Sequence, residues 1–179
     1  MSSTTILLDR NRQFASDFAA ADLPVLPRLR TVVLTCADQR VDPAHILGLE
    51  LGEVAVMRNN GGRVTEAVVE EVATLAFMVA KMDGPEPRPW ELVLMQHTKC
   101  GAERFADPDF QRVLKEHIGV DVSSSAIADH EQSLREDVER LRGAPGVPGY
   151  IVVSGLLYDV QNGRVREVFA PTPLGSFAS

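Results

Sequence analysis

The sequence of 179 residues has little of several features that direct a chain to particular functions. Its 18 lysines and arginines are outnumbered by 25 aspartates and glutamates, which gives a formal net charge of −7. Nucleic-acid binding needs a basic face that neutralises phosphates, so this composition argues against a nucleic-acid partner. Aromatic residues make up only 6% of the chain. Valine, leucine, isoleucine and alanine nevertheless supply the apolar volume of a globular core.

Long hydrophobic runs and targeting signals are also missing. The longest apolar candidate, residues 72–80, is far shorter than the roughly 20 residues of a membrane helix. The N-terminus has no basic segment followed by an apolar one, the pattern of a secretory signal. We therefore expect no membrane association and a cytoplasmic location. The chain has only two cysteines, Cys36 and Cys100. In a reducing compartment these suit metal binding or catalysis better than a disulfide.

Four apolar segments rich in β-branched residues are the strongest structural signal. They lie at residues 31–35, 54–57, 92–95 and 150–154, and they do not alternate apolar with polar side chains. Continuous apolar strands are typical of a parallel sheet whose two faces are both covered by helices. The sequence therefore predicts a buried parallel sheet.

Helical patterns separate these strands, at residues 43–49, 65–81 and 123–142. This alternation predicts one α/β domain over residues 1–179, with its core at 31–179 and a mostly parallel central sheet flanked by helices. The charged part of the last helix, residues 131–142, is expected to be a solvated face.

The two ends of the chain depart from the alternating pattern. Residues 1–23 carry thinly spaced apolar positions and predict an N-terminal helical arm. Residues 156–160 and 165–169 flank an Asn162-Gly163 dipeptide. They predict a C-terminal antiparallel hairpin with a two-residue turn at the sheet edge.

Chemically useful side chains follow the first three predicted strands. Because ligands of open α/β sheets bind beyond the carboxyl ends of the strands, we expect these residues to meet at one edge. Two thiolates and one imidazole are a ligand set for zinc, and three protein ligands leave a fourth position open, as in catalytic sites. In chain order the residues are Cys36, Asp38 and Arg40, then Arg58, Asn59, Asn60, Gly61 and Gly62, then His97 and Cys100.

Three motifs in this order resemble the β-class carbonic anhydrases: Cys36-x-Asp38-x-Arg40, Arg58-Asn59-x-Gly61-Gly62 and His97-x-x-Cys100-Gly101. The resemblance runs from about residue 31 to 105 and returns at the terminal hairpin. It implies an α/β enzyme with one Zn²⁺ per chain that interconverts carbon dioxide and bicarbonate. It further implies Cys36, His97 and Cys100 as zinc ligands, Asp38 with Arg40 as the catalytic pair, and a homodimer or homotetramer. The thin helical arm and the edge hairpin fit such an assembly, because neither can bury its apolar face alone.

This ligand set suggests how the reaction would proceed. Two thiolates and a neutral imidazole cancel the zinc charge, so bound water should be acidified less than in a three-histidine site. Asp38 is near enough to Cys36 in sequence to accept a hydrogen bond from that water, and Arg40 can hold the carboxylate. The zinc-bound hydroxide would then attack carbon dioxide. No histidine is placed by the sequence to carry the proton away.

Two further hypotheses concern the same residues. Asp38 can itself become the fourth zinc ligand and close the site, and we expect a pH-dependent balance between the closed and open states. Backbone N–H groups of the turn formed by Asn59, Asn60, Gly61 and Gly62 can bind carboxylate oxygens or shape the substrate pocket.

Other interpretations stay open at this point. The same scaffold could hydrolyse carbonyl sulfide or carbon disulfide, which are linear molecules like carbon dioxide, or it could be a non-catalytic zinc- or anion-binding module. The cysteines could be ordinary buried thiols, and Asp38 with Arg40 a plain ion pair. We expect Arg58 to pair with a carboxylate or to anchor a neighbouring subunit. His45, His117 and His130 have no second ligand nearby in sequence and are expected at the surface.

Overall fold

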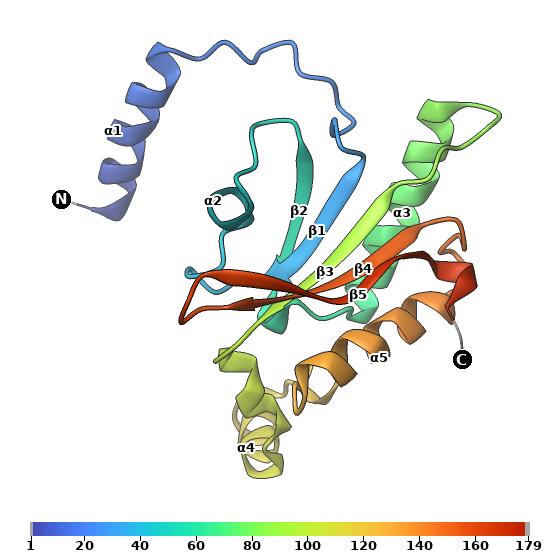
Figure 1. Cartoon of the computed structure of the whole chain (residues 1–179). Helices are drawn as coiled ribbons and strands as arrows, with labels where there is room; N and C mark the ends of the chain where they lie inside the picture. Colours follow the sequence, from blue (N-terminus) through green and yellow to red (C-terminus); the bar gives the residue numbers. More distant parts are fainter. Residues whose placement is uncertain (1, 178–179) are drawn as a thin grey trace.

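The computed structural model describes residues 2–177 and contains one five-stranded sheet in the order β2-β1-β3-β4-β5 (Figure 1). The first four strands pair in parallel, and β5 pairs antiparallel with β4. This confirms the predicted mostly parallel sheet with an antiparallel C-terminal strand. The strands are β1 (Thr31–Cys36), β2 (Val54–Asn59), β3 (Glu91–His97), β4 (Val152–Asp159) and β5 (Arg164–Pro173).

Five α-helices connect or flank these strands, and several begin at side-chain caps. At the start of α2, the Asp42 side chain accepts a hydrogen bond from the Ala44 N–H. The side chains of Thr65 and Asp129 likewise accept hydrogen bonds from backbone N–H groups at the starts of α3 and α5. The helices are α1 (Ser3–Ser16), α2 (Pro43–Leu47), α3 (Glu66–Asp83), α4 (Pro108–Ile118) and α5 (His130–Arg142).

The core lies on both faces of the sheet, as the continuous apolar strands predict. On one face, β1 and β3 pack against α3 and α5, with Leu34 and Leu94 fully buried. On the other face, Val33 and Met95 pack against α2. Strands β1 and β3 are therefore buried on both sides, which fixes the positions of the segments that follow them.

Three predictions about the C-terminal half need correction. The helix expected at 123–142 begins only at His130, because Asp129 caps it through the Gln132 N–H. The predicted segments 150–154 and 156–160 merge into one strand, β4, which covers only Val152–Asp159. The hairpin turn has four residues, 160–163, instead of two, since Asp159 pairs with Arg164 across the sheet.

Helix α5 differs most from its sequence pattern. Residues 131–142 were expected to form a solvated face, but one side of the helix is buried, including Leu134, Asp137 and Leu141. Helix α4 was not predicted, although Phe110, Val113, Leu114 and Ile118 recur at helical spacing after the capping residue Asp107; none of its residues is buried in the structure. Hydrophobic periodicity does not reveal charged residues that are buried within ion pairs.

The N-terminal helical arm is confirmed for α1, which stands apart from the sheet (Figure 1). None of its residues is buried, and Leu7, Leu8 and Phe14 are exposed. Residues 17–30 lead to β1 without forming a helix or strand. Among the described helices, none combines the length and hydropathy needed to cross a membrane.

Candidate metal centre at the carboxyl end of the sheet

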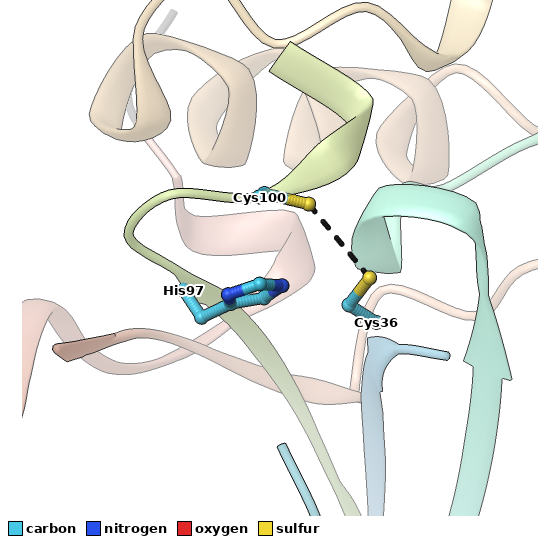
Figure 2. Close-up of side chains that lie close together, drawn as sticks. All are labelled: Cys36, His97 and Cys100. Atoms are coloured by element: carbon cyan, nitrogen blue, oxygen red, sulfur yellow. Dashed lines mark hydrogen bonds between the residues drawn. The ribbon is translucent and has the colours of Figure 1, made fainter. Parts of the chain in front are cut away.

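Two cysteines and one histidine converge where β1 and β3 end (Figure 2). Cys36 is the last residue of β1, His97 is the last residue of β3, and Cys100 follows three residues later. One candidate ligand atom from each lies within 4.8 Å of the others, and the two sulfurs are 3.7 Å apart. All three side chains are buried. The parallel register of β1 and β3 therefore brings together residues that are 64 positions apart in sequence.

The imidazole of His97 leaves one nitrogen free for a ligand. Its Nδ1 lies 3.0 Å from the Thr98 carbonyl oxygen and donates to it in the matching tautomer. Its Nε2 is buried and has no hydrogen-bond partner. Buried polar atoms are nearly always paired, so an orphaned Nε2 facing two sulfurs is the arrangement expected of a metal ligand.

The pKa values of the two thiols are shifted in opposite directions. Their hydrogen bond lowers the pKa of Cys36 and raises the pKa of Cys100, because the Cys36 thiolate accepts a hydrogen bond from the Cys100 thiol, which keeps its proton. Backbone N–H groups of Asp38 and Gly61 further lower the pKa of Cys36. Thiolate is the metal-binding form of cysteine. Two sulfurs and one imidazole nitrogen thus fit Zn²⁺, and the described residues contain no other such cluster of three.

Asp38 and Arg40 form a bidentate ion pair beside this cluster. Arg40 donates from Nε to Oδ1 at 2.9 Å and from Nη2 to Oδ2 at 2.6 Å. This pairing holds the pKa of Asp38 well below its usual range. Asp38 Oδ2 also lies 4.0 Å from the free Nε2 of His97. The carboxylate is therefore ionised, oriented by Arg40 and adjacent to the candidate ligands.

The loop between the last two candidate ligands supports this pair. Arg40 Nη2 donates to the Lys99 carbonyl oxygen at 3.0 Å. Lys99 has a φ of 54°, a left-handed conformation that is rare for residues other than glycine. This conformation accompanies a tight turn between His97 and Cys100.

Arg58 has a different partner from the one predicted. It donates to three backbone carbonyl oxygens, those of Cys36 at 3.0 Å, Asp38 at 2.7 Å and Val41 at 2.9 Å. The expected carboxylate partner is wrong, because Arg58 at the end of β2 lies beside the loop that leaves β1. Arg58 consequently fixes the backbone that carries Cys36 and Asp38.

The predicted glycine turn lies directly against Cys36. Asn59 closes the turn by accepting from the Arg63 N–H at 3.0 Å and donating to the Arg63 carbonyl oxygen at 2.7 Å. A Cβ on Gly62 would lie 2.8 Å from the Thr35 carbonyl carbon and 2.9 Å from the Cys36 nitrogen. Only glycine permits this approach. Gly61 is buried as well, whereas Asn60 is exposed.

One of the three histidines that were predicted to lie at the surface is partly buried instead. His130, the first residue of α5, is only 17% exposed and contacts Gln96 Oε1 at 2.8 Å and Glu103 Oε1 at 3.2 Å. Glu103 Oε1 in turn accepts from the Cys100 N–H at 2.9 Å. His45 and His117 are exposed as expected.

The predictions from the sequence did not include these two supporting residues, and only one of them left a signal in the sequence. Glu103 stands three residues after Cys100, the spacing of a capping box, so its bond to Cys100 had a readable signal. His130 had none, because its partner Glu103 is 27 residues away in sequence.

Comparisons with known proteins agree on one family. The family model for carbonic anhydrase matches residues 31–142. The crystal structure of carbonic anhydrase from Streptococcus mutans is 35% identical, with 94% of this chain and 99% of that chain covered and a TM-score of 0.77.

Two curated relatives extend this finding. β-Carbonic anhydrase 1 of Mycobacterium tuberculosis is 29% identical over 170 residues, which cover 94% of this chain and 99% of that protein. A carbon disulfide hydrolase of Acidithiobacillus thiooxidans is 28% identical over 167 residues, which cover 78% of this chain and 71% of that protein. The family match spans more than half of the sequence and includes all three candidate ligands, and we conclude that the chain belongs to the β-carbonic anhydrase family.

Proposed function

We propose that this protein is a zinc-dependent carbonic anhydrase that reversibly hydrates carbon dioxide to bicarbonate and a proton. The observation that carries the proposal is the position of the Asp38–Arg40 pair beside the cluster of Cys36, His97 and Cys100. A purely structural metal site has no use for an oriented, ionised carboxylate at its border. Family membership supports the same reaction.

Cys36, His97 and Cys100 would hold one Zn²⁺ per chain. When bound, the ion would supply a Lewis acid that lowers the pKa of water to make a nucleophile near neutral pH. The three side chains are already buried, and His97 Nε2 needs a partner, so little rearrangement of these residues is required.

Asp38 would accept a hydrogen bond from the attacking water at Oδ2 and so orient it. Arg40 contributes by keeping this carboxylate ionised and by fixing both of its oxygens. The Asn59, Asn60, Gly61 and Gly62 turn would border the substrate pocket. The Gly61 N–H acts on the Cys36 sulfur, so we assign its hydrogen bond to the thiolate rather than to the substrate.

Stopped-flow measurement of carbon dioxide hydration by zinc-loaded protein at alkaline pH tests this function. A rate well above that of buffer supports it, and the absence of any such rate rejects it. Zinc content measured on the same sample separates a missing metal from a missing activity. If zinc is bound and no substrate is turned over, the chain is a non-catalytic zinc-binding module.

A second function, hydrolysis of carbon disulfide or carbonyl sulfide, is favoured by the carbon disulfide hydrolase relative. The residues of the proposed metal site do not distinguish these linear substrates from carbon dioxide. Assays of all three substrates on one preparation decide between them. Sulfide release without carbon dioxide hydration would make this second function the correct one.

Asp38 is also proposed as a fourth zinc ligand in a closed state. In the structure Arg40 holds both Asp38 oxygens, the arrangement that we would expect of the open state. Closure would require the carboxylate to leave Arg40. Crystal structures of the zinc protein at acid and alkaline pH test the proposed balance, and an unchanged ligand set at both would reject it.

We further propose a homodimer or homotetramer. Helix α1 buries none of its residues and exposes apolar side chains, among them Leu7 and Phe14. A second copy of the chain would cover this arm. Sedimentation at micromolar concentration should give a species larger than a monomer, and a monomer would contradict the proposal.

A further inference from the structure

A buried ion pair outside the proposed catalytic groups joins two distant parts of the chain. Arg63 follows the Asn59–Gly62 turn, and Asp137 lies in the middle of α5. Their side chains are 1% and 0% exposed, and Arg63 Nε donates to Asp137 Oδ2 at 2.8 Å. Burial raises the pKa of Asp137, and the Arg63 guanidinium opposes this rise. Fully buried charges are costly to desolvate, so such a pair calls for an explanation beyond stability.

The guanidinium of Arg63 binds the N-terminal half of α5 and the segment that precedes this helix. It donates to the carbonyl oxygens of Ala126 and Ser133, the latter at 3.4 Å, and contacts Glu136 Oε2 at 3.4 Å. From the opposite direction, Arg140 of α5 donates to the Val64 carbonyl oxygen at 3.0 Å. The segment after the glycine turn is therefore held on α5 through side chains of both elements.

The turn transmits this attachment to Cys36. Gly62 lies so close to the Thr35–Cys36 peptide that even a Cβ would collide with it. A Cβ on Gly61 would lie 3.2 Å from Ile127 Cδ1, and Ile127 belongs to the same apolar cluster as Cys36 and Cys100. A shift of the turn would thus alter the position of one candidate ligand, Cys36.

We propose that Arg63 and Asp137 are positioning residues for the metal site, which hold the glycine turn on α5 so that the turn fixes the backbone position of Cys36. The inference rests on the proposed metal-binding function. Neither residue touches the reacting groups. Their effect on the metal is exerted through the backbone of Gly61 and Gly62.

The double variant Arg63→Met/Asp137→Leu tests this proposal. Replacing both charges by apolar side chains leaves no unpaired buried charge, and such replacements are often tolerated by the fold. The matched control is Arg30→Met/Asp83→Leu, which removes an ion pair at the amino end of the sheet. Three measurements are made on each protein: thermal unfolding, zinc affinity by competition with a chromophoric chelator, and the thiolate-to-metal absorption of the cobalt-substituted protein.

The proposal predicts that the Arg63/Asp137 variant folds but binds zinc about 10–100-fold more weakly, the usual effect of losing a group that orients a metal ligand. Its cobalt spectrum should also shift. The control should keep the zinc affinity and spectrum of the wild type. Unchanged affinity and spectrum in the Arg63/Asp137 variant would overturn the proposal. If this double variant does not fold, Arg63→Lys, which retains the charge but not the spread of donors, is judged by the same criteria.

An NMR measurement separates this inference from the proposed function. In metal-free protein, the amide resonances of Gly61 and Gly62 should shift in the Arg63/Asp137 variant and stay in place in the control. If the wild type binds no zinc, the proposed function fails, while the amide shifts still report whether Arg63 and Asp137 hold the turn. Unshifted amides would refute the positioning role in either case.

Discussion

Two bidentate arginine–aspartate pairs flank strand β1, one at each end of the sheet, and their hydrogen-bond distances are nearly the same. Before the strand, Arg30 donates to the two oxygens of Asp83 at 3.0 and 2.6 Å. After it, Arg40 donates to those of Asp38 at 2.9 and 2.6 Å. Both arginines also donate to backbone carbonyl oxygens.

The surroundings of the two pairs differ. The Asp83 carboxylate is 2% exposed and is enclosed by Arg30 and by the Arg88 N–H, so it joins the end of α3 to the start of β1. The Asp38 carboxylate is 14% exposed and lies 4.0 Å from the unpartnered His97 Nε2. A pair of the same two residue types is thus enclosed at one end of the sheet and adjacent to the candidate metal ligands at the other. The neighbouring groups distinguish the two pairs.

The largest effect should come from removing the ligand cluster that distinguishes the carboxyl end. We expect His97→Gln to lose bound zinc and to reduce carbon dioxide hydration to background, because only two candidate ligands remain. Metal analysis and stopped-flow rates measure both. His117→Gln, at an exposed position on α4, is the control and should change neither. Full activity in the His97 variant would show that the ligand cluster does not distinguish the carboxyl end of the sheet from the amino end in function.

The second test changes the two carboxylates separately. We expect Asp38→Asn to lower kcat by about 10²–10³-fold, the usual effect of removing one group that is positioned to hydrogen-bond the reacting atoms. Asp83→Asn should leave kcat and KM unchanged while lowering the Tm, because it weakens the Arg30 pair. Both variants are compared by stopped-flow assay and by calorimetry. Equal loss of activity in the two would show that the ends of the sheet are not functionally distinct.

The pH dependence of unfolding sharpens the structural assignment of Asp83. The hydrogen bond from Arg30 lowers the pKa of Asp83 to about 2, against about 3.9 for an unfolded aspartate. Its stabilisation is complete above the unfolded value and is lost as the pH falls from about 4 toward 2. Urea unfolding across this range should show a smaller loss for Asp83→Asn than for the wild type. Asp109→Asn, at an exposed site on α4, should behave like the wild type.

The smallest effect concerns the two left-handed residues beside these pairs, Arg30 with φ 49° and Lys99 with φ 54°. Lys99→Gly should raise the free energy of unfolding of the metal-free protein by less than ~1 kcal/mol, since relief of strain exceeds the entropic penalty of glycine only slightly. Arg30→Gly relieves the same strain but removes the Asp83 ion pair, so we expect net destabilisation. Denaturant unfolding measures both, and a destabilised Lys99→Gly variant would contradict this account.

Local patterns were enough to predict much of the fold. The continuous apolar segments predicted β1 and β3 as buried parallel strands, because only a sheet covered on both faces accommodates them. The hairpin turn and the start of α5 were misjudged. In both places an aspartate, Asp159 or Asp129, sets the end of the strand or the start of the helix through local hydrogen bonds. The spacing of hydrophobic residues does not reveal these bonds.

The supporting residues of the site were beyond the reach of sequence patterns. Arg63 and Asp137 are 74 positions apart, and each looks like an ordinary surface charge in its own segment. His130 is likewise indistinguishable from His117 until α5 is placed next to Glu103. Such pairings depend on which helix face meets which loop, and tertiary packing alone sets that.

The sequence by itself determined the chemistry that is available: two thiols, an imidazole and an Asp-x-Arg pair after strands that had to be parallel and buried. Strand order and hydrophobic patterning are local properties, and they sufficed to predict that these groups share one edge. The tertiary structure decided how they are used. It left His97 Nε2 without a partner, enclosed Asp83 but not Asp38, and buried Arg63 against α5, because each of these outcomes depends on contacts between segments that are distant in the chain.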